Sequence, residues 1–129
     1  MACRITELVL DAREPEVLAE WWCAVLDYRI VGREDDGAVE IGRADGTLPT
    51  ILFQPVAAPK REKLRLHIDV NPTDRDQAAE LERLLALGAR PADVGQTGEE
   101  DWHVLADPEG NEFCLLRSRR PPTSADPSR

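Results

Sequence analysis

The most constraining feature of this 129-residue sequence is an order of elements that it predicts twice. Residues 4–10 alternate apolar and polar side chains, which indicates a strand, and residues 14–26 carry apolar side chains at helical spacing. Three short strands are expected next, and the second half then repeats a strand, a helix and three strands. The remaining predicted elements are 29–33, 38–42, 50–55, 63–70, 75–87, 89–92 and the two strands of a hairpin around 107–111.

A constant shift of sixty residues relates the two halves of the chain. This shift matches Glu7 with His67 and Gln54 with Cys114. Few residues are identical, so it is the matching order of elements that predicts an α+β fold of two βαβββ modules. The expected boundaries are about 4–56 for the first module, about 63–116 for the second, 1–116 for the whole domain and 117–129 for a disordered tail.

The turn Asp-Pro-Glu-Gly-Asn joins the last two predicted strands. Pro108 presets φ near about −65°, and Gly110 can adopt the positive φ that such a turn requires. Asp-Pro-x-Gly-Asn followed by Glu-Phe-Cys-Leu-Leu resembles the last hairpin of the vicinal oxygen chelate superfamily, and within it the glyoxalase-like proteins. The resemblance extends over nearly the whole chain, to about residue 116. It implies two curved mixed sheets, with their helices outside, that enclose a cleft for a small molecule.

Composition narrows the classes of function. The net charge of −9 argues against nucleic acid and anionic membranes as partners, and it permits a cationic ligand. No apolar run approaches the length of a membrane span, and the first residues do not have the pattern of a secretory signal. The three cysteines are an odd number without metal-type spacing, which is typical of reduced thiols. We therefore expect a cytoplasmic protein.

The resemblance also implies where a metal or catalytic site would lie. In metal-dependent members of the superfamily, the ligands come from the first and last strands of each module. The resemblance assigns Glu7, Gln54, His67 and Cys114 to those positions. It further implies that the first strands of the two modules meet across the cleft, which would bring Glu7 to His67. Strand alternation directs these side chains away from the faces that the helices cover.

On the residues alone, both a metal-bound and a metal-free site stay open. Zinc accepts carboxylate, imidazole and thiolate ligands together, and nickel is a second candidate cofactor. Gln54 is a neutral and weak ligand, and a free thiol such as Cys114 is mostly protonated at neutral pH. Without metal, Cys114 is either a small buried apolar residue or a nucleophile paired with His67. His67 is then either a hydrogen-bonded structural histidine or a general base beside Asp69 and Glu7.

Further polar and aromatic residues are candidates for substrate binding. Arg65 and Asp69 share the polar face of the strand that carries His67. Trp102 and His103 are adjacent in the sequence, so alternation allows at most one of them to point into a pocket. The expected catalytic residues are His67 and Glu7, and the expected substrate-binding residues are Arg65, Asp69, Gln54, Cys114, Trp102 and His103.

Two classes of function follow from the resemblance and the charge. The first is a glyoxalase-like lyase or isomerase that binds a small oxygenated molecule and abstracts a proton next to a carbonyl. The second is a metal-free protein that sequesters a cationic compound, as bleomycin-resistance members of the superfamily do. Glutamates at positions 54 and 114 would have favoured the enzyme. The exposed sheet edges of such small modules also predict a homodimer.

Overall fold

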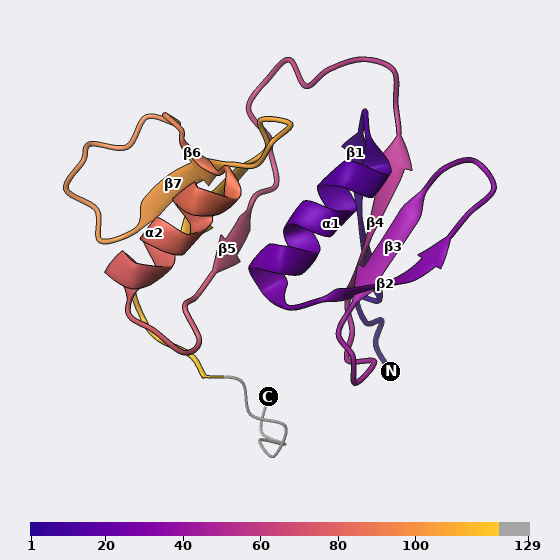
Figure 1. Ribbon diagram of the computed structural model, residues 1–129, viewed down its shortest axis with the longest axis horizontal. Helices are drawn as coiled ribbons and strands as arrows, with labels where there is room; N and C mark the ends of the chain where they lie inside the picture. Colours follow the sequence, from indigo (N-terminus) through magenta and orange to yellow (C-terminus); the bar gives the residue numbers. More distant parts are fainter. Residues whose placement is uncertain (122–129) are drawn as a thin grey trace. The chain divides into compact units, whose positions relative to one another are not determined.

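The computed structural model describes residues 1–121 of the chain. It divides into two units, Met1–Arg61 and Glu62–Arg129, and each unit has the order strand, helix and three strands (Figure 1). The predicted α+β fold of two βαβββ modules is therefore confirmed. Among the described residues, no helix combines the length and the apolar character that crossing a membrane would require.

In unit 1 a single helix packs on one face of a four-stranded sheet. The elements are β1 (Glu7–Ala12), α1 (Pro15–Leu26), β2 (Arg29–Arg33), β3 (Val39–Gly42) and β4 (Thr50–Pro55). The strand order is β1-β4-β3-β2, with β1 parallel to β4 and the other pairs antiparallel. Pro15 suits the first turn of α1 because the N–H that proline lacks would have no helical partner there. Trp22, Leu18 and Phe53 are at most 2% exposed and form the centre of this core.

Unit 2 repeats this arrangement with shorter strands. Its elements are β5 (Ile68–Val70), α2 (Gln77–Leu87), β6 (Arg90–Pro91), β7 (His103–Ala106) and β8 (Glu112–Leu115), in the sheet order β5-β8-β7-β6. The first strand was expected from residue 63 but begins at Ile68. Before it, the backbone N–H of Leu64 donates to the side chain of Glu112 at 3.0 Å instead of to a strand backbone. Asp76 caps α2, and its carboxylate accepts the N–H of Ala79 at 2.9 Å.

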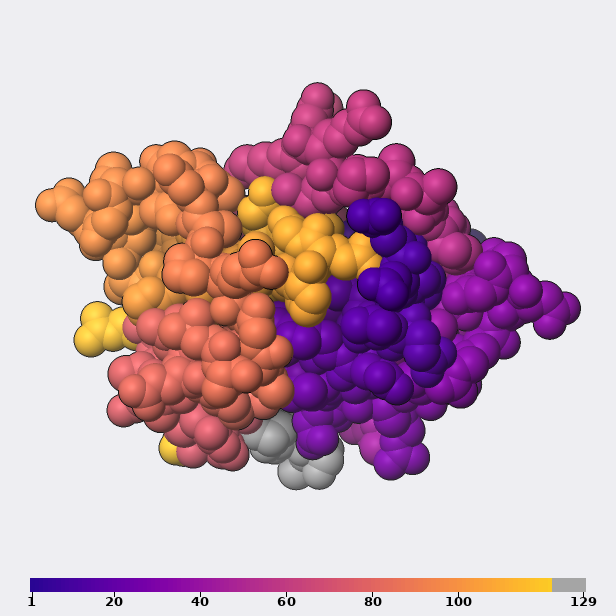
Figure 2. All heavy atoms as spheres, turned by 45° about the horizontal axis from the view of Figure 1, so that its top comes forward, coloured from indigo at the N-terminus to yellow at the C-terminus, as the bar shows by residue number. Residues whose placement is uncertain are grey.

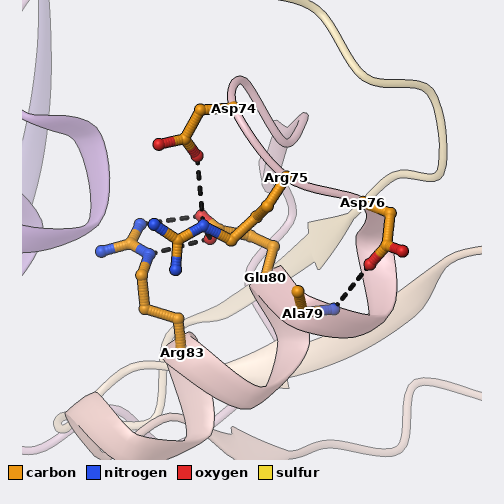
Figure 3. A network of polar contacts seen from close by, with 6 residues as sticks. All are labelled: Asp74, Arg75, Asp76, Ala79, Glu80 and Arg83. Atoms are coloured by element: carbon orange, nitrogen blue, oxygen red, sulfur yellow. Dashed lines mark hydrogen bonds and ion pairs between the residues drawn. The ribbon is translucent and has the colours of Figure 1, made fainter.

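The first turn of α2 buries a charged residue that the apolar pattern did not predict. Glu80 is 9% exposed, and its carboxylate accepts two hydrogen bonds from Arg83, at 2.8 and 2.7 Å (Figure 3). Arg75 lies 3.7 Å from Glu80 and donates to Asp74 at 3.1 Å. A buried carboxylate is tolerable because these guanidinium groups compensate its charge.

The turn between β7 and β8 is closed by the side chain of its first residue. Asp107 is 3% exposed, and its carboxylate accepts the backbone N–H groups of Glu109 and Asn111 and the side-chain amide of Asn111, at 2.9 to 3.1 Å. Gly110 has a φ of 86°, which a residue with a Cβ would adopt only under strain. The motif that carried the family resemblance is thus a turn that fixes the strands on either side of it.

Strand register differs from the sixty-residue correspondence at one point. In unit 2, Asp69 lies opposite Cys114, and in unit 1, Asp11 lies opposite Gln54. The offset between the two units therefore differs by two positions between their first strands and their last strands, so a single shift of sixty does not hold for both. The match of Glu7 with His67 and the match of Gln54 with Cys114 cannot both follow the strand register.

The chain after β8 continues along unit 2. The amide of Asn71 donates to the carbonyl of Ser118 at 2.9 Å, and the N–H of Arg120 donates to the carbonyl of Pro72 at 2.7 Å. These bonds hold residues 118–120 of the segment that was expected to be a disordered tail. The rest of that prediction, for 122–129, lies outside the described residues.

Candidate functional site

Three of the expected site residues meet on the face of the unit 2 sheet opposite its core. Ile68 pairs with the buried Phe113, so the residues on either side of Ile68 point to the opposite face. His67 and Asp69 occupy those positions, and Asp69 is the direct partner of Cys114 on β8. The alternation that was read from the sequence therefore brings an imidazole, a carboxylate and a thiol together.

The carboxylate of Asp69 interacts with both of the other groups. Nε2 of His67 is 3.5 Å from Oδ1 of Asp69, and both side chains are about half exposed, at 46% and 50%. The thiol of Cys114 donates a hydrogen bond to Asp69. Burial, followed by the negative charge of Asp69 and this hydrogen bond, raises the pKa of the Cys114 thiol. The thiol therefore stays protonated at neutral pH, which weakens its interpretation as a nucleophile.

These groups border a space of about 510 Å³ within unit 2, which we call the unit 2 hollow. Its size is in the range that accommodates a small organic molecule. The lining combines apolar and polar side chains, with the apolar residues Val94, Trp102, Val104 and Leu116 and the polar or small residues His67, Asp69, Gly95, Gln96, Glu100 and Cys114.

Part of the hollow is lined by residues 92–102, the loop that joins β6 to β7 and forms an orange projection at the upper left of Figure 2. Glu100 organises this loop, because its carboxylate accepts the N–H groups of Thr97 and Gly98, each at 2.9 Å. These bonds, led by the one from Thr97, lower the pKa of Glu100, so its carboxylate is ionised at neutral pH. Gln77 of α2 donates to the carbonyl of Asp101 at 2.8 Å and ties the loop to the helix.

The expected site residues of unit 1 have different partners. Gln54 lies opposite Asp11 and donates to its carboxylate at 3.3 Å. Glu7 lies opposite Thr50 and shares a hydrogen bond with Glu40. Partial desolvation, together with the negative charges of Glu40 and Glu34, raises the pKa of the Glu7 carboxyl. The roles of Glu7 and Gln54 as ligands to a metal shared with unit 2 stay predictions.

The remaining candidates lie at the edge of unit 2. Trp102 lines the hollow, whereas His103 opens β7 opposite Leu115 and is exposed. Arg65 is exposed and precedes β5. Sequence reasoning missed Val94, Gln96 and Glu100. Their loop is polar and has no periodicity, so only its length and its acidic residues hinted at a role.

The donor set within unit 2 fits zinc. The ligand atoms of His67, Asp69 and Cys114 all lie within 4.8 Å of one another. Tetrahedral zinc separates its ligand atoms by about 3–4 Å, so small side-chain movements would complete a three-residue centre with an open position. The thiol would have to release its proton first, and the neighbouring carboxylate opposes that step. Asp69, which was expected to bind substrate, is here the carboxylate nearest to the imidazole and the thiol.

Comparisons with known proteins agree with the fold. The glyoxalase-like domain family matches residues 7–116 of the chain. No curated protein matches it at the threshold applied. The fosfomycin resistance protein FosX from Mesorhizobium loti has a similar structure, with a TM-score of 0.70 and 16% identity over 92% of this chain and 94% of that chain.

Two further solved structures extend this similarity. A mutant of FosX from Listeria monocytogenes, in complex with Mn(II) and 1S,2S-dihydroxypropylphosphonic acid, has a TM-score of 0.69 and 14% identity, and 90% of each chain is covered. A glyoxalase/bleomycin resistance protein/dioxygenase family enzyme from Burkholderia phytofirmans has a TM-score of 0.63 and 14% identity, over 85% of this chain and 94% of that chain. At these identities the similarity establishes the fold, and the ligands named belong to those proteins.

Proposed function

Because the chain belongs to the glyoxalase-like domain family, we propose that it binds a small oxygenated organic molecule in the unit 2 hollow and moves a proton on it. The observation that carries this proposal is the position of His67, whose imidazole lines the hollow 3.5 Å from a carboxylate. An imidazole that is oriented by a carboxylate is suited to general acid–base catalysis.

In this mechanism Asp69 positions His67. Oδ1 of Asp69 faces Nε2 of the His67 ring, which leaves Nδ1 of that ring to exchange a proton with the ligand. The C–H bond next to a ligand carbonyl breaks, its electron pair moves onto the carbonyl oxygen as an enolate, and the imidazole holds the proton until it returns to carbon. For an α-hydroxy ketone, the proton can instead return to the former carbonyl carbon while the hydroxyl proton passes to the enolate oxygen; this gives an isomer, and atoms and charge balance without a further reactant. The protonated thiol of Cys114 holds Asp69 in place through its hydrogen bond.

A metal-bound form of the site would use the same residues differently. His67, Asp69 and Cys114 would hold the ion. When bound, zinc or nickel would polarise an oxygen of the ligand and stabilise its negative charge. In that form the imidazole is a ligand, so proton transfer would need another group.

The test is exchange of carbon-bound protons of hydroxyacetone in D₂O, followed by proton NMR with and without added zinc or nickel. We expect His67→Gln to reduce the protein-dependent rate by about 10²-fold or more, because a general base typically contributes that much. The matched control is His103→Gln, which changes the only other histidine and should leave the rate unchanged. Exchange that persists in His67→Gln, or no exchange by the unmodified protein under any of these conditions, would contradict the proposal.

We further propose that the protein forms a homodimer. Among residues 1–121, each four-stranded sheet ends in strands whose outer edges pair with no further strand of their own unit, and unpaired edges favour association. Light scattering at micromolar concentration should give twice the chain mass. A monomer mass at that concentration would refute the dimer and leave the proton-transfer proposal intact.

A further inference from the structure

Apart from the His67 imidazole, the ionised side chains that line the unit 2 hollow are carboxylates. Two carboxylates, Asp69 and Glu100, border it, and no Lys or Arg is among its described lining residues. A phosphonate or carboxylate ligand would therefore meet repulsion in this hollow unless a cation accompanied it.

The carboxylate of Glu100 is fixed before any ligand arrives. It accepts hydrogen bonds from two backbone N–H groups of its own loop and from the hydroxyl of Thr97 at 3.1 Å. These bonds leave the negative charge of the carboxylate in place, and this charge attracts an ammonium group without needing a free acceptor position. Because the loop holds the group, little side-chain freedom would be lost on binding.

Trp102, two residues after Glu100 on the same loop, adds an aromatic side chain to the lining. Trp102 lines the hollow and is 42% exposed, so part of its indole surface is accessible. The electron-rich face of an indole attracts ammonium groups, and tryptophan is the best of the aromatic residues for this interaction. Val94, Val104 and Leu116 add apolar surface to the same space.

We propose that the hollow selects an organic cation, with an ammonium group beside the Glu100 carboxylate and the Trp102 ring and an apolar body against Val94 and Leu116. This inference rests on the proposed function, because it assumes that the hollow binds a small molecule, and it names the class of that molecule. The neighbouring FosX structure binds a phosphonic acid, so the two proteins would share a fold and differ in ligand charge.

Three probes share a benzyl group and differ in charge: benzyltrimethylammonium is a cation, benzyl alcohol is neutral and benzylphosphonate is an anion. Binding is followed through the indole N–H signal of Trp102 in ¹H–¹⁵N spectra, which Trp102→Phe identifies among the three tryptophans. We expect the cation to bind about two- to fivefold more tightly than the alcohol, and the phosphonate to bind most weakly. The preference for the cation should fall as salt is added.

Glu100→Gln tests the subsite against a matched control on the same loop. It should weaken cation binding by about two- to fivefold and leave alcohol binding unchanged. Glu99→Gln removes the same charge from an exposed neighbour outside the described lining and should have no effect on the ratio of the two affinities. Because Glu100 also holds the loop, Trp102→Leu provides a second test, in which the cation-to-alcohol ratio should fall by a similar factor. Binding to this variant is followed through the backbone N–H signals of Gly95 and Gln96, because the indole signal is absent.

Equal or tighter binding of the phosphonate would overturn the inference, as would an unchanged cation-to-alcohol ratio in both Glu100→Gln and Trp102→Leu. In either case a moving Trp102 signal would still support the hollow as a binding site, and the proposed function would survive. If none of the probes moves that signal, the inference fails together with the assumption that the hollow binds small molecules.

Discussion

The two units share one fold but differ in the connection between their second and third strands. In unit 1 this connection is the short turn 34–38, and in unit 2 it is the 92–102 loop. The short turn is closed by a backbone bond from Gly37 to Glu34 at 3.0 Å, whereas the long loop lines the hollow. A duplicated scaffold thus supplies two similar sheets, and a change in one loop distinguishes the unit that carries the candidate site.

The open sheet faces differ in their chemistry as well. In unit 1 the first and last strands present Glu7, Asp11 and Gln54, which bond to groups within that unit. In unit 2 the corresponding strands present His67, Asp69 and Cys114 beside a space for a ligand. The comparison therefore predicts that equivalent substitutions affect stability alike in the two units and affect function only in unit 2.

The largest expected effect is common to both units. Phe53→Ala and Phe113→Ala each remove a ring that is at most 1% exposed, so each should lower the free energy of unfolding by about 3–5 kcal/mol. Urea denaturation of the two variants checks this. Values that differ by more than about a factor of two would contradict the equivalence of the cores.

A smaller loss of stability is expected from substitutions in turns, and it should differ between a buried turn and an exposed one. Asp107→Ala removes the acceptor of the buried N–H of Asn111 and of the part-buried N–H of Glu109, and the buried donor alone should cost about 1–3 kcal/mol. Asp45 of unit 1 makes a similar bond to Thr47 at 2.9 Å, but in an exposed turn, so Asp45→Ala should be much milder. Thermal melts in which both variants lose the same stability would contradict the importance of burial here.

The smallest predicted effect is a difference in pH dependence. The pKa of Glu100 is lowered on folding, so its stabilising contribution is present above the ordinary value of 4.5 and is lost as the pH falls through its folded pKa. The pKa of Glu7 is raised, so its contribution is present below 4.5 and is lost as the pH rises through its folded pKa. At pH 7, Glu100→Gln should therefore destabilise the protein and Glu7→Gln should not.

Denaturation from pH 3 to pH 7 measures both variants against the parent protein. The stability deficit of Glu100→Gln should shrink as the pH falls through the folded pKa of Glu100, because the carboxylate of the parent protein is then neutralised as well. A loss of stability that is constant over this range would show that Glu100→Gln acts through loop packing, because the charge of the Glu100 carboxylate would then have no effect.

Strand alternation sufficed to predict which face carries His67, Asp69 and Cys114, because a two-residue period is a local property of the backbone. It did not predict register. The matches of Glu7 with His67 and of Gln54 with Cys114 assumed one constant shift, but the pairing of the first strand with the last differs by two residues between the units. The loop residue Glu100 was missed for a related reason, since its position depends on bonds within an irregular segment.

The central claim is that His67 serves the hollow and not the core, and His67→Ala tests it most directly when unfolding and hydroxyacetone exchange are measured on one preparation. A half-exposed histidine beside a half-exposed carboxylate should contribute less than about 1 kcal/mol to stability. The account predicts a nearly unchanged denaturation midpoint together with loss of protein-dependent exchange. A loss of about 1–3 kcal/mol, as expected for a structural hydrogen bond, with exchange unchanged in the folded fraction would contradict it.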